Sequence, residues 1–235
     1  MRYPSDIGYS DEGFILPELN IIEHVIKFNG KKDGLFVEEA TTLSDRRAAR
    51  KESMNDRVMQ TAERINKSDK IWLVWCNLND ESAMLSKAIN GAVEVKGADS
   101  NDHKEKAMLD FQESKIKCLV TKPRIAGFGM NWQNCSEMAF VGLSDSYEQF
   151  YQALRRCWRF GQMDKVTAHI VIGEKEKSVS KNIKRKEADM VTMYSNMIVH
   201  MKDLTKSELK KSKKTQTLYN AACDMVLPEF LKEGI

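Results

Sequence analysis

The sequence predicts an α/β fold, in which a mainly parallel sheet is flanked by helices and followed by a C-terminal helical appendage. Short apolar runs alternate with segments of helical periodicity between residues 71 and 172, as is typical of a parallel sheet covered by helices. The run 71–76 is apolar throughout, which indicates a strand buried on both faces of that sheet. Ligands of such sheets bind at the carboxyl ends of the strands, so we expect functional residues in those loops.

Each expected element rests on its own local pattern. Ser44 is expected to cap a first helix, in which Met54, Val58, Ala62 and Ile65 recur at helical spacing. Two more helices are predicted before the arginine-rich segment described below, at residues 82–89 and at residues 102–113 after a cap at Ser100 or Asn101. Strands are predicted at the short apolar runs, residues 20–28, 35–39, 71–76, 93–95, 116–121, 138–143 and 166–172.

The composition changes at both ends of this alternating region. Residues 1–18 are rich in turn-forming Pro, Gly, Ser and Asp, which indicates an irregular lead-in or linker. Beyond Gly173 no strand pattern remains, and two long helices are predicted at residues 175–201 and 206–231. We therefore expect a lead-in (1–18), one main domain (19–173) and a helical extension (174–235).

Bulk properties exclude several classes of protein. The formal net charge of the 235 residues is only +3, so any basic surface must come from local clustering. No apolar run approaches the roughly 20 residues of a membrane span, and the amino terminus lacks the apolar core of a secretory signal, so we expect no membrane partner and a cytoplasmic location. The five cysteines are scattered singly, which argues against zinc sites and disulfides.

The segment YQALRRCWRFGQ, residues 151–162, carries the clearest chemistry. Gln152, Arg156 and Arg159 are four and three residues apart, which predicts one shared helical face, with Gly161 as the helix stop. Two guanidinium groups on one face suit a polyphosphate, because arginine binds phosphate oxygens bidentately and keeps its charge. An ordinary basic helix face paired with acidic neighbours is the alternative interpretation.

A second segment, TKPRIAGFGMNWQ at residues 121–133, is a glycine-containing loop directly after a predicted strand. Glycines at Gly127 and Gly129 allow the backbone to approach a phosphate closely, whether that phosphate belongs to a nucleotide or to a nucleic acid. The loop precedes the arginine segment by about one strand and one connection. Alone, this Gly-x-Gly pattern would be weak support for any function.

Together the two segments resemble motifs VI and V of superfamily 2 helicases, and the Arg-Phe-Gly-Gln ending is most similar to Swi/Snf-type ATPases. The resemblance spans residues 19–172, corresponds to the C-terminal RecA-like lobe alone, and extends to a phage-type subgroup, hence a bacterial or phage-infected cell. It implies that Arg156 and Arg159 reach the γ-phosphate of ATP, with Arg159 as the arginine finger. It also implies ATP contacts from Gln152, Gly127 and Gly129 and nucleic-acid contacts from Arg124, Asn131 and Lys104. Trp132 is expected in the core.

Other parts of a complete motor are not found in the sequence. There is no Gly-x-x-x-x-Gly-Lys followed by Ser or Thr, and neither Asp-Glu pair continues as an acidic box. We therefore expect ATP and Mg²⁺ to bind mainly on an N-terminal P-loop lobe of the same motor, and the chain to be inactive alone. The Swi/Snf-like ending favours DNA as the track, with RNA possible.

Two other functions remain open at this level. A helicase-derived lobe could serve as a non-catalytic module that binds nucleic acid or protein, although such a module has little need of both arginines. An unrelated doubly wound enzyme that binds a small nucleotide would show the same α/β alternation. The four histidines are isolated, and the sequence contains neither His-Glu-x-x-His nor Gly-x-Ser-x-Gly, so zinc and acyl-transfer chemistry have no specific support.

Overall fold

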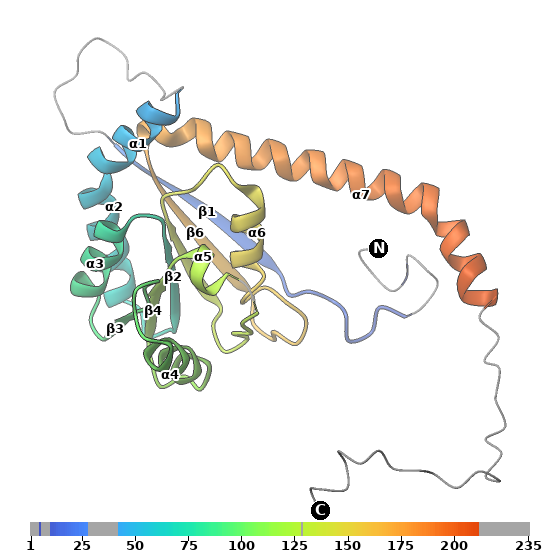
Figure 1. Ribbon diagram of the computed structural model, residues 1–235, viewed down its shortest axis with the longest axis horizontal. Coiled ribbons are helices and arrows are strands. Elements are labelled where there is room, and N and C mark those ends of the chain that lie inside the picture. Colours follow the sequence, from blue (N-terminus) through green and yellow to red (C-terminus); the bar gives the residue numbers. More distant parts are fainter. Residues whose placement is uncertain (1–4, 6–9, 28–41, 128, 212–235) are drawn as a thin grey trace, which may run out of the picture.

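The computed structural model describes residues 5, 10–27, 42–127 and 129–211. Within them, six parallel strands form one sheet in the order β1-β6-β5-β2-β4-β3 (Figure 1). The predicted fold class is therefore confirmed. The strands are β1 (Leu19–Ile26), β2 (Trp72–Cys76), β3 (Ala92–Glu94), β4 (Cys118–Thr121), β5 (Glu137–Val141) and β6 (Val166–Gly173).

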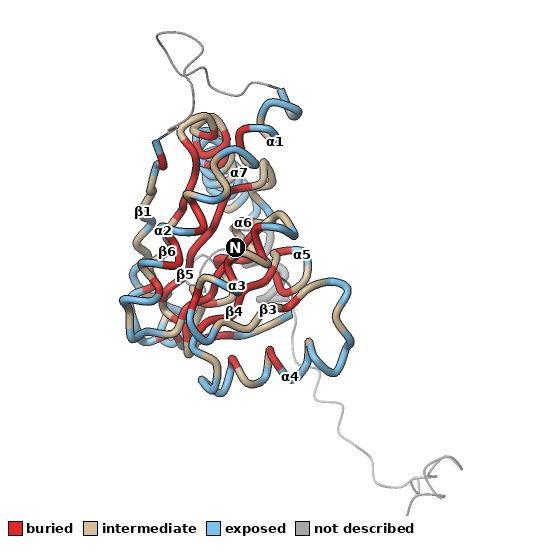
Figure 2. Tube along the Cα trace, turned by 90° about the vertical axis from the view of Figure 1, so that its left-hand side faces the viewer, coloured by how far each residue is buried: buried red, intermediate tan, exposed pale blue. Residues whose placement is uncertain are grey.

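Helices cover both faces of this sheet because its strands alternate apolar side chains between two separate cores. One core lies under α2 (Met54–Asn66) and α3 (Asn79–Ala88). The opposite core is the larger, and Figure 2 shows the inner strands β2, β4 and β5 as buried. It lies under α4 (Asn101–Gln112), α5 (Pro123–Ala126), α6 (Tyr147–Leu154) and the first turns of α7 (Lys177–Lys211).

The prediction for the first helix was wrong in two respects. The segment forms two helices, α1 (Leu43–Glu52) and α2, and they meet at Ser53, which is the C-cap of the first and the N-cap of the second. The cap of α1 is Thr42, because Thr42 and Asp45 exchange side-chain and backbone hydrogen bonds in a capping box. The strand predicted at residues 35–39 lies outside the described residues.

The helical extension begins with the 3-10 turn η2 (Glu174–Glu176) and continues as one helix, α7, through Lys211. The break predicted between residues 201 and 206 is therefore absent, and the rest of the second predicted helix lies outside the described residues. Val179 and Ile183 anchor the first turns of α7 in the core, and the helix then projects from the body (Figure 1). No helix in the described part of the chain is long and apolar enough to cross a membrane.

Two histidines join β1 to β6 at the edge of the sheet. His24 on β1 is paired with Val171, and His169 on β6 is paired with Ile22, so the two histidines are two positions apart in the register. His24 Nε2 lies 2.9 Å from His169 Nδ1. The guanidinium of Arg64 lies 3.1 Å from His24 Nε2, and Glu137 contacts the other nitrogen of His169. Burial and the charge of Arg64 lower the pKa of His24 to about 4 and also lower the pKa of His169. Both rings therefore favour the neutral form in the folded protein.

This pair predicts a loss of stability in acid. An unfolded histidine has a pKa of about 6.5, so the folded chain binds fewer protons than the unfolded chain below that pH. The stabilising contribution is present above about pH 6.5 and declines as the pH falls towards about 4. Urea denaturation across this range should show a shallower pH dependence for His24→Gln than for the wild type. His103→Gln, at an exposed site on α4, should keep the wild-type dependence.

Candidate functional site

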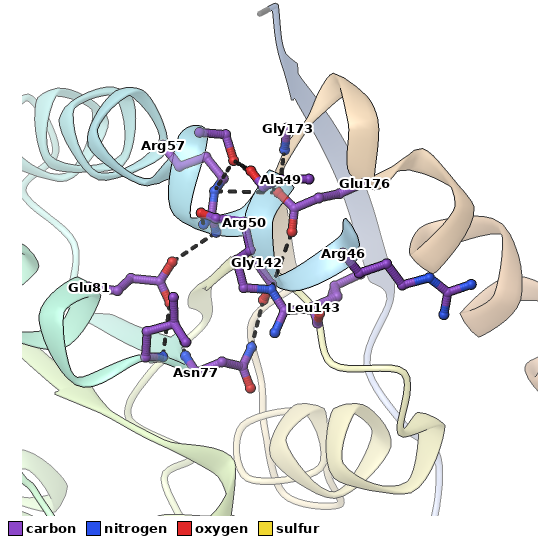
Figure 3. Close-up of polar contacts among 12 residues, drawn as sticks. Arg46, Ala49, Arg50, Arg57, Asn77, Glu81, Gly142, Leu143, Gly173 and Glu176 are labelled. Carbon is purple, nitrogen blue, oxygen red and sulfur yellow. Dashed lines mark hydrogen bonds and ion pairs between the residues drawn. The ribbon is translucent and has the colours of Figure 1, made fainter. Parts of the chain in front are cut away.

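A buried ionic network fixes the loops at the carboxyl edge of the sheet. Arg57 of α2 is fully buried, and its Nη1 lies 2.8 Å from Oε1 of the equally buried Glu81. Its Nη2 donates to the carbonyl of Arg50 at 2.7 Å, and its Nε faces Ser53 and the buried Glu176 (Figure 3). One guanidinium thereby joins α1, α2, α3 and the turn before α7.

Both carboxylates of this network also receive backbone hydrogen bonds. Oε2 of Glu81 accepts from the N–H of Asn77, just beyond β2, at 3.0 Å. Oε2 of Glu176 accepts from the N–H of Gly173, at the end of β6, at 2.9 Å. Gly142, after β5, has φ +75°, and a Cβ there would lie 2.4 Å from Arg57 Nη1. The network therefore sets the positions of three loops and requires glycine in one of them.

A cleft of about 540 Å³ opens beside this network, over the carboxyl ends of β2, β4 and β5. Among the described residues that line it, five side chains are cationic and one, that of Asp145, is a carboxylate. The cations come from α1 on one wall and from the start of α5 on the other. They are Arg46, Arg47, Arg50, Lys122 and Arg124.

Only Arg124 of these cations was singled out from the sequence. The missed signal is the cluster Arg46-Arg47-Ala-Ala-Arg50-Lys51, whose spacing places several cations on α1. Its position at the cleft depends on Arg50, which donates from Nε to Glu176 at 3.3 Å and from Nη2 to the carbonyl of Leu143. These contacts join residues about 90 or more positions apart, so local sequence could not reveal them.

The arginine segment differs from its predicted helix. Helix α6 ends at Leu154, so Arg156 and Arg159 follow it in a series of turns, and Gly161 is not the helix stop. The helical ladder stops there because the N–H of Arg156 donates to the Ala153 carbonyl at 3.1 Å, while the Gln152 carbonyl accepts from Arg156 Nε instead. The expectation of one helical face is therefore wrong.

Gln152 and Arg156 nevertheless lie together. Arg156 Nε donates to the Gln152 carbonyl at 3.0 Å, its Nη2 to the Gln152 side chain at 3.3 Å, and its Nη1 to the Met130 carbonyl at 2.9 Å. Burial, and then the charges of Arg159 and Arg155, lower the pKa of Arg156. The segment therefore holds clustered cations, in which each charge disfavours the others.

The three arginines of this cluster differ in how they are held. Arg155 stacks over the rings of Trp158 and Phe160, at 5.3 and 5.4 Å from their centroids. Neither Arg156 nor Arg159 has a carboxylate partner among the described residues, and the half-buried Arg159 side chain makes no hydrogen bond with them. The cluster is thus arranged to receive an anion.

The glycine loop provides some of its expected contacts and not others. Gly127 is buried at φ −73°, its N–H donates to the Pro123 carbonyl at 2.8 Å, and a Cβ there would strike that carbonyl. Gly127 therefore allows tight packing and has no N–H available for a phosphate. Gly129 is exposed at φ +81°, and Asn131 is exposed beside it. Trp132 is fully buried, as expected.

Lys104 lies apart from both clusters. It belongs to α4, which follows the edge strand β3, and its Nζ donates to the carbonyl of Gly97 at 2.8 Å. It is not among the residues that line the cleft. The structure thus brings Arg124 to the cleft, gathers Gln152, Arg156, Gly129 and Asn131 around the arginine segment, and leaves Lys104 at the sheet edge.

Residues 50–161 match the family model of the helicase conserved C-terminal domain. Just under half of this chain is therefore similar to a helicase C-terminal domain. The matched range contains the arginine segment, the glycine loop and Lys104, and it begins at Arg50, after the first turns of α1. No curated protein matches the chain.

Solved structures of low sequence identity share the RecA-like fold of this domain. The RNA helicase Prp28 from Chaetomium thermophilum bound to ADP is 14% identical, with a TM-score of 0.53 over 73% of this chain and 37% of that chain. The C-terminal part of the Fun30 ATPase domain is 16% identical, with a TM-score of 0.49 over 56% of this chain and 45% of that chain. A DEAD box protein from the hyperthermophile Methanococcus jannaschii is 20% identical, with a TM-score of 0.49 over 56% and 37%. This chain spans less than half the length of each.

Proposed function

We propose that this chain is the C-terminal half of an ATP-driven helicase or translocase. In this proposal Arg156 and Arg159 contact the phosphates of an ATP molecule, which is bound together with Mg²⁺ mainly by an N-terminal P-loop lobe. Residues 19–173 form the motor lobe, residues 1–18 lead into it, and residues 174–235 extend it. The helicase domain match supports the general class, and the arrangement of the arginines supports the division of roles.

The observation that carries the proposal is the unequal environment of the two arginines. The Arg156 side chain is held by the carbonyls of Gln152 and Met130, whereas the Arg159 side chain beside it has no hydrogen-bond partner in the described part of the chain. The neighbouring charge of Arg159 contributes to lowering the pKa of Arg156, and a polyphosphate would offset this repulsion between the two cations. We therefore assign Arg159 as the finger and Arg156 as the residue that connects it to the glycine loop.

The remaining residues divide between nucleotide and nucleic acid. Gln152 orients Arg156 through its side-chain oxygen, and the exposed backbone of Gly129 is open to a phosphate. Gly127 keeps a packing role only. Arg124 in the cleft and Asn131 in the loop are the proposed strand contacts, and Lys104 would meet nucleic acid only at the far edge of the sheet. The Swi/Snf-like ending favours double-stranded DNA as the track, with RNA as the second candidate.

The isolated chain is expected to show negligible ATP hydrolysis, with or without DNA, because it supplies no P-loop to hold the phosphates. Joining it to its cognate P-loop lobe should produce nucleic-acid-stimulated turnover, measured as phosphate release. DNA-stimulated turnover by the isolated chain at the rate of a complete motor would contradict the proposal. A two-lobe protein that binds nucleic acid but never hydrolyses ATP would instead support the non-catalytic binding module.

A further inference from the structure

The first turns of α1 bring two arginines to the cleft from outside the matched helicase domain. Arg46 and Arg47 both line the cleft, and the domain match begins only at Arg50. Arg47 is exposed and has no hydrogen bond or ion pair within the described residues. These two side chains therefore extend the basic lining beyond the part of the chain that carries the helicase motifs.

This wall of the cleft is fixed in place by buried contacts. Arg50, one turn further along α1, is held by Glu176 and by the Leu143 carbonyl, and Arg57 Nη2 caps the Arg50 carbonyl at 2.7 Å. The start of α1 is held by the Thr42 capping box. Arg46 and Arg47 thus project from a short helix that is anchored at both ends, and Arg46 points away from the buried network (Figure 3).

The opposite wall supplies cations that face the same space. Lys122 and Arg124, at the carboxyl end of β4, line the cleft together with the amide of Asn77. Among the described residues of the lining, Asp145 is the only carboxylate, against five cations. A concave surface with this excess of positive charge attracts a polyanion, and several cations in a row match the repeated phosphates of a nucleic-acid backbone.

The single carboxylate is already engaged with one of these arginines. Arg46 Nη1 lies 2.6 Å from Asp145 Oδ1, and both side chains are partly exposed. A partly exposed ion pair is weak in water, so a phosphate can replace the carboxylate as the partner of Arg46. Asp145 therefore holds Arg46 against the cleft wall and competes with an incoming phosphate.

We infer that α1 is a strand clamp, in which Arg46 and Arg47 bind adjacent backbone phosphates of a nucleic acid in the cleft and Asp145 retains Arg46 when the cleft is empty. This inference rests on the proposed function, because it requires the domain to bind nucleic acid. It adds contacts that precede the helicase domain and a carboxylate that opposes binding.

The test measures binding of the full chain to fluorescein-labelled single-stranded DNA, single-stranded RNA and duplex DNA by anisotropy over a series of salt concentrations. The association constant K falls as salt rises, so log K against log salt has a negative slope. Each lost phosphate contact makes this slope less steep, by about 0.7 on a single strand and about 0.9 on B-DNA. The variant Arg46→Ala/Arg47→Ala should therefore reduce the steepness of the slope by about 1.4 on the single strands and about 1.8 on the duplex. Arg185→Ala, an exposed arginine of α7, should leave it unchanged.

The carboxylate is tested by a double-mutant cycle. Asp145→Asn should tighten binding severalfold, because the phosphate no longer competes for Arg46. In the Arg46→Ala background the same substitution should have no further effect. An equal gain in both backgrounds would show a general effect of charge and would overturn the role of Asp145. Thermal melts of each variant check that the fold is retained.

The outcomes separate this inference from the proposed function. If Arg124→Ala weakens binding while Arg46→Ala/Arg47→Ala does not, the domain binds nucleic acid and the α1 clamp is wrong. If the wild-type chain binds none of the three probes at low salt, the strand-binding part of the proposed function fails first. If both sets of substitutions weaken binding, the clamp is supported, and the probe that binds most tightly identifies the track.

Discussion

Arg159→Ala in the two-lobe protein is expected to lower ATP turnover by about 10³-fold or more, the range that arginine fingers contribute. The reason is that the Arg159 side chain makes no hydrogen bond in the described part of the fold, so its truncation breaks no side-chain contact of that kind and should mainly remove charge stabilisation at the transferring phosphoryl group. Nucleotide affinity should be largely retained. Steady-state phosphate release and equilibrium binding of a fluorescent ATP analogue measure the two quantities separately.

Matched substitutions sharpen this test. Arg159→Lys keeps the charge but loses the bidentate fork, so it should restore only part of the turnover. Arg156→Ala should also disturb the glycine loop, because Arg156 Nη1 holds the Met130 carbonyl, and its effect on nucleic-acid binding should exceed that of Arg159→Ala. The two-lobe protein with Arg185→Ala on α7 should hydrolyse ATP at the wild-type rate. Unchanged turnover in Arg159→Ala would exclude the finger role.

Arg57→Met is expected to destabilise the isolated chain by about 3–5 kcal/mol, because it leaves the buried Glu81 without its ionic partner. The side chain has no access to water, and Glu176 also faces its Nε at 3.6 Å. Urea denaturation followed by circular dichroism would measure the free energy of unfolding. Lys67→Met, which breaks an exposed ion pair with Glu63, should cost less than about 1 kcal/mol.

The cost of Arg57→Met should depend on pH in a defined direction. Burial already raises the pKa of Glu81, and Arg57 opposes that rise, so removing Arg57 should raise the pKa further. A raised folded-state pKa contributes stability that is complete below the unfolded value, about 4.3, and is lost as the pH rises through the folded value. The difference in the free energy of unfolding between the wild type and Arg57→Met should therefore become smaller as the pH falls. Arg57→Met/Glu81→Gln should show little of this pH dependence.

Local sequence was sufficient for most of the elements and insufficient for their ends. The run that forms β2 was recognised because apolar residues without polar interruption are buried on both faces, and β6 was recognised because its apolar residues predominate around Thr167 and His169. The end of α6 was missed because the Arg156 side chain takes the Gln152 carbonyl and also bonds the Met130 carbonyl, 26 positions away. The junction at Ser53 was missed because its hydroxyl bonds Glu176, 123 positions away.

The candidate site shows the same division. The composition of the arginine and glycine segments identified Arg156, Arg159 and Gly129 without any structure, because their residue types and spacing suit phosphate chemistry. Gly127 could not be distinguished from Gly129 in this way, since only the backbone geometry shows that its N–H is already used. The cleft itself could not be predicted, because its two walls come from α1 and from the loop after β4.

By itself the sequence determined the fold class and most of the elements, and it singled out the two segments that we propose contact phosphates, because hydrophobic periodicity and side-chain chemistry are local properties. The tertiary structure decided which cations share a cleft and where the buried charges meet. It also decided that the Arg156 side chain is held by hydrogen bonds, whereas the Arg159 side chain makes none in the described part of the fold. Those features depend on Arg57, Glu81 and Glu176, whose ionic contacts become favourable only when packing excludes water and brings distant segments together.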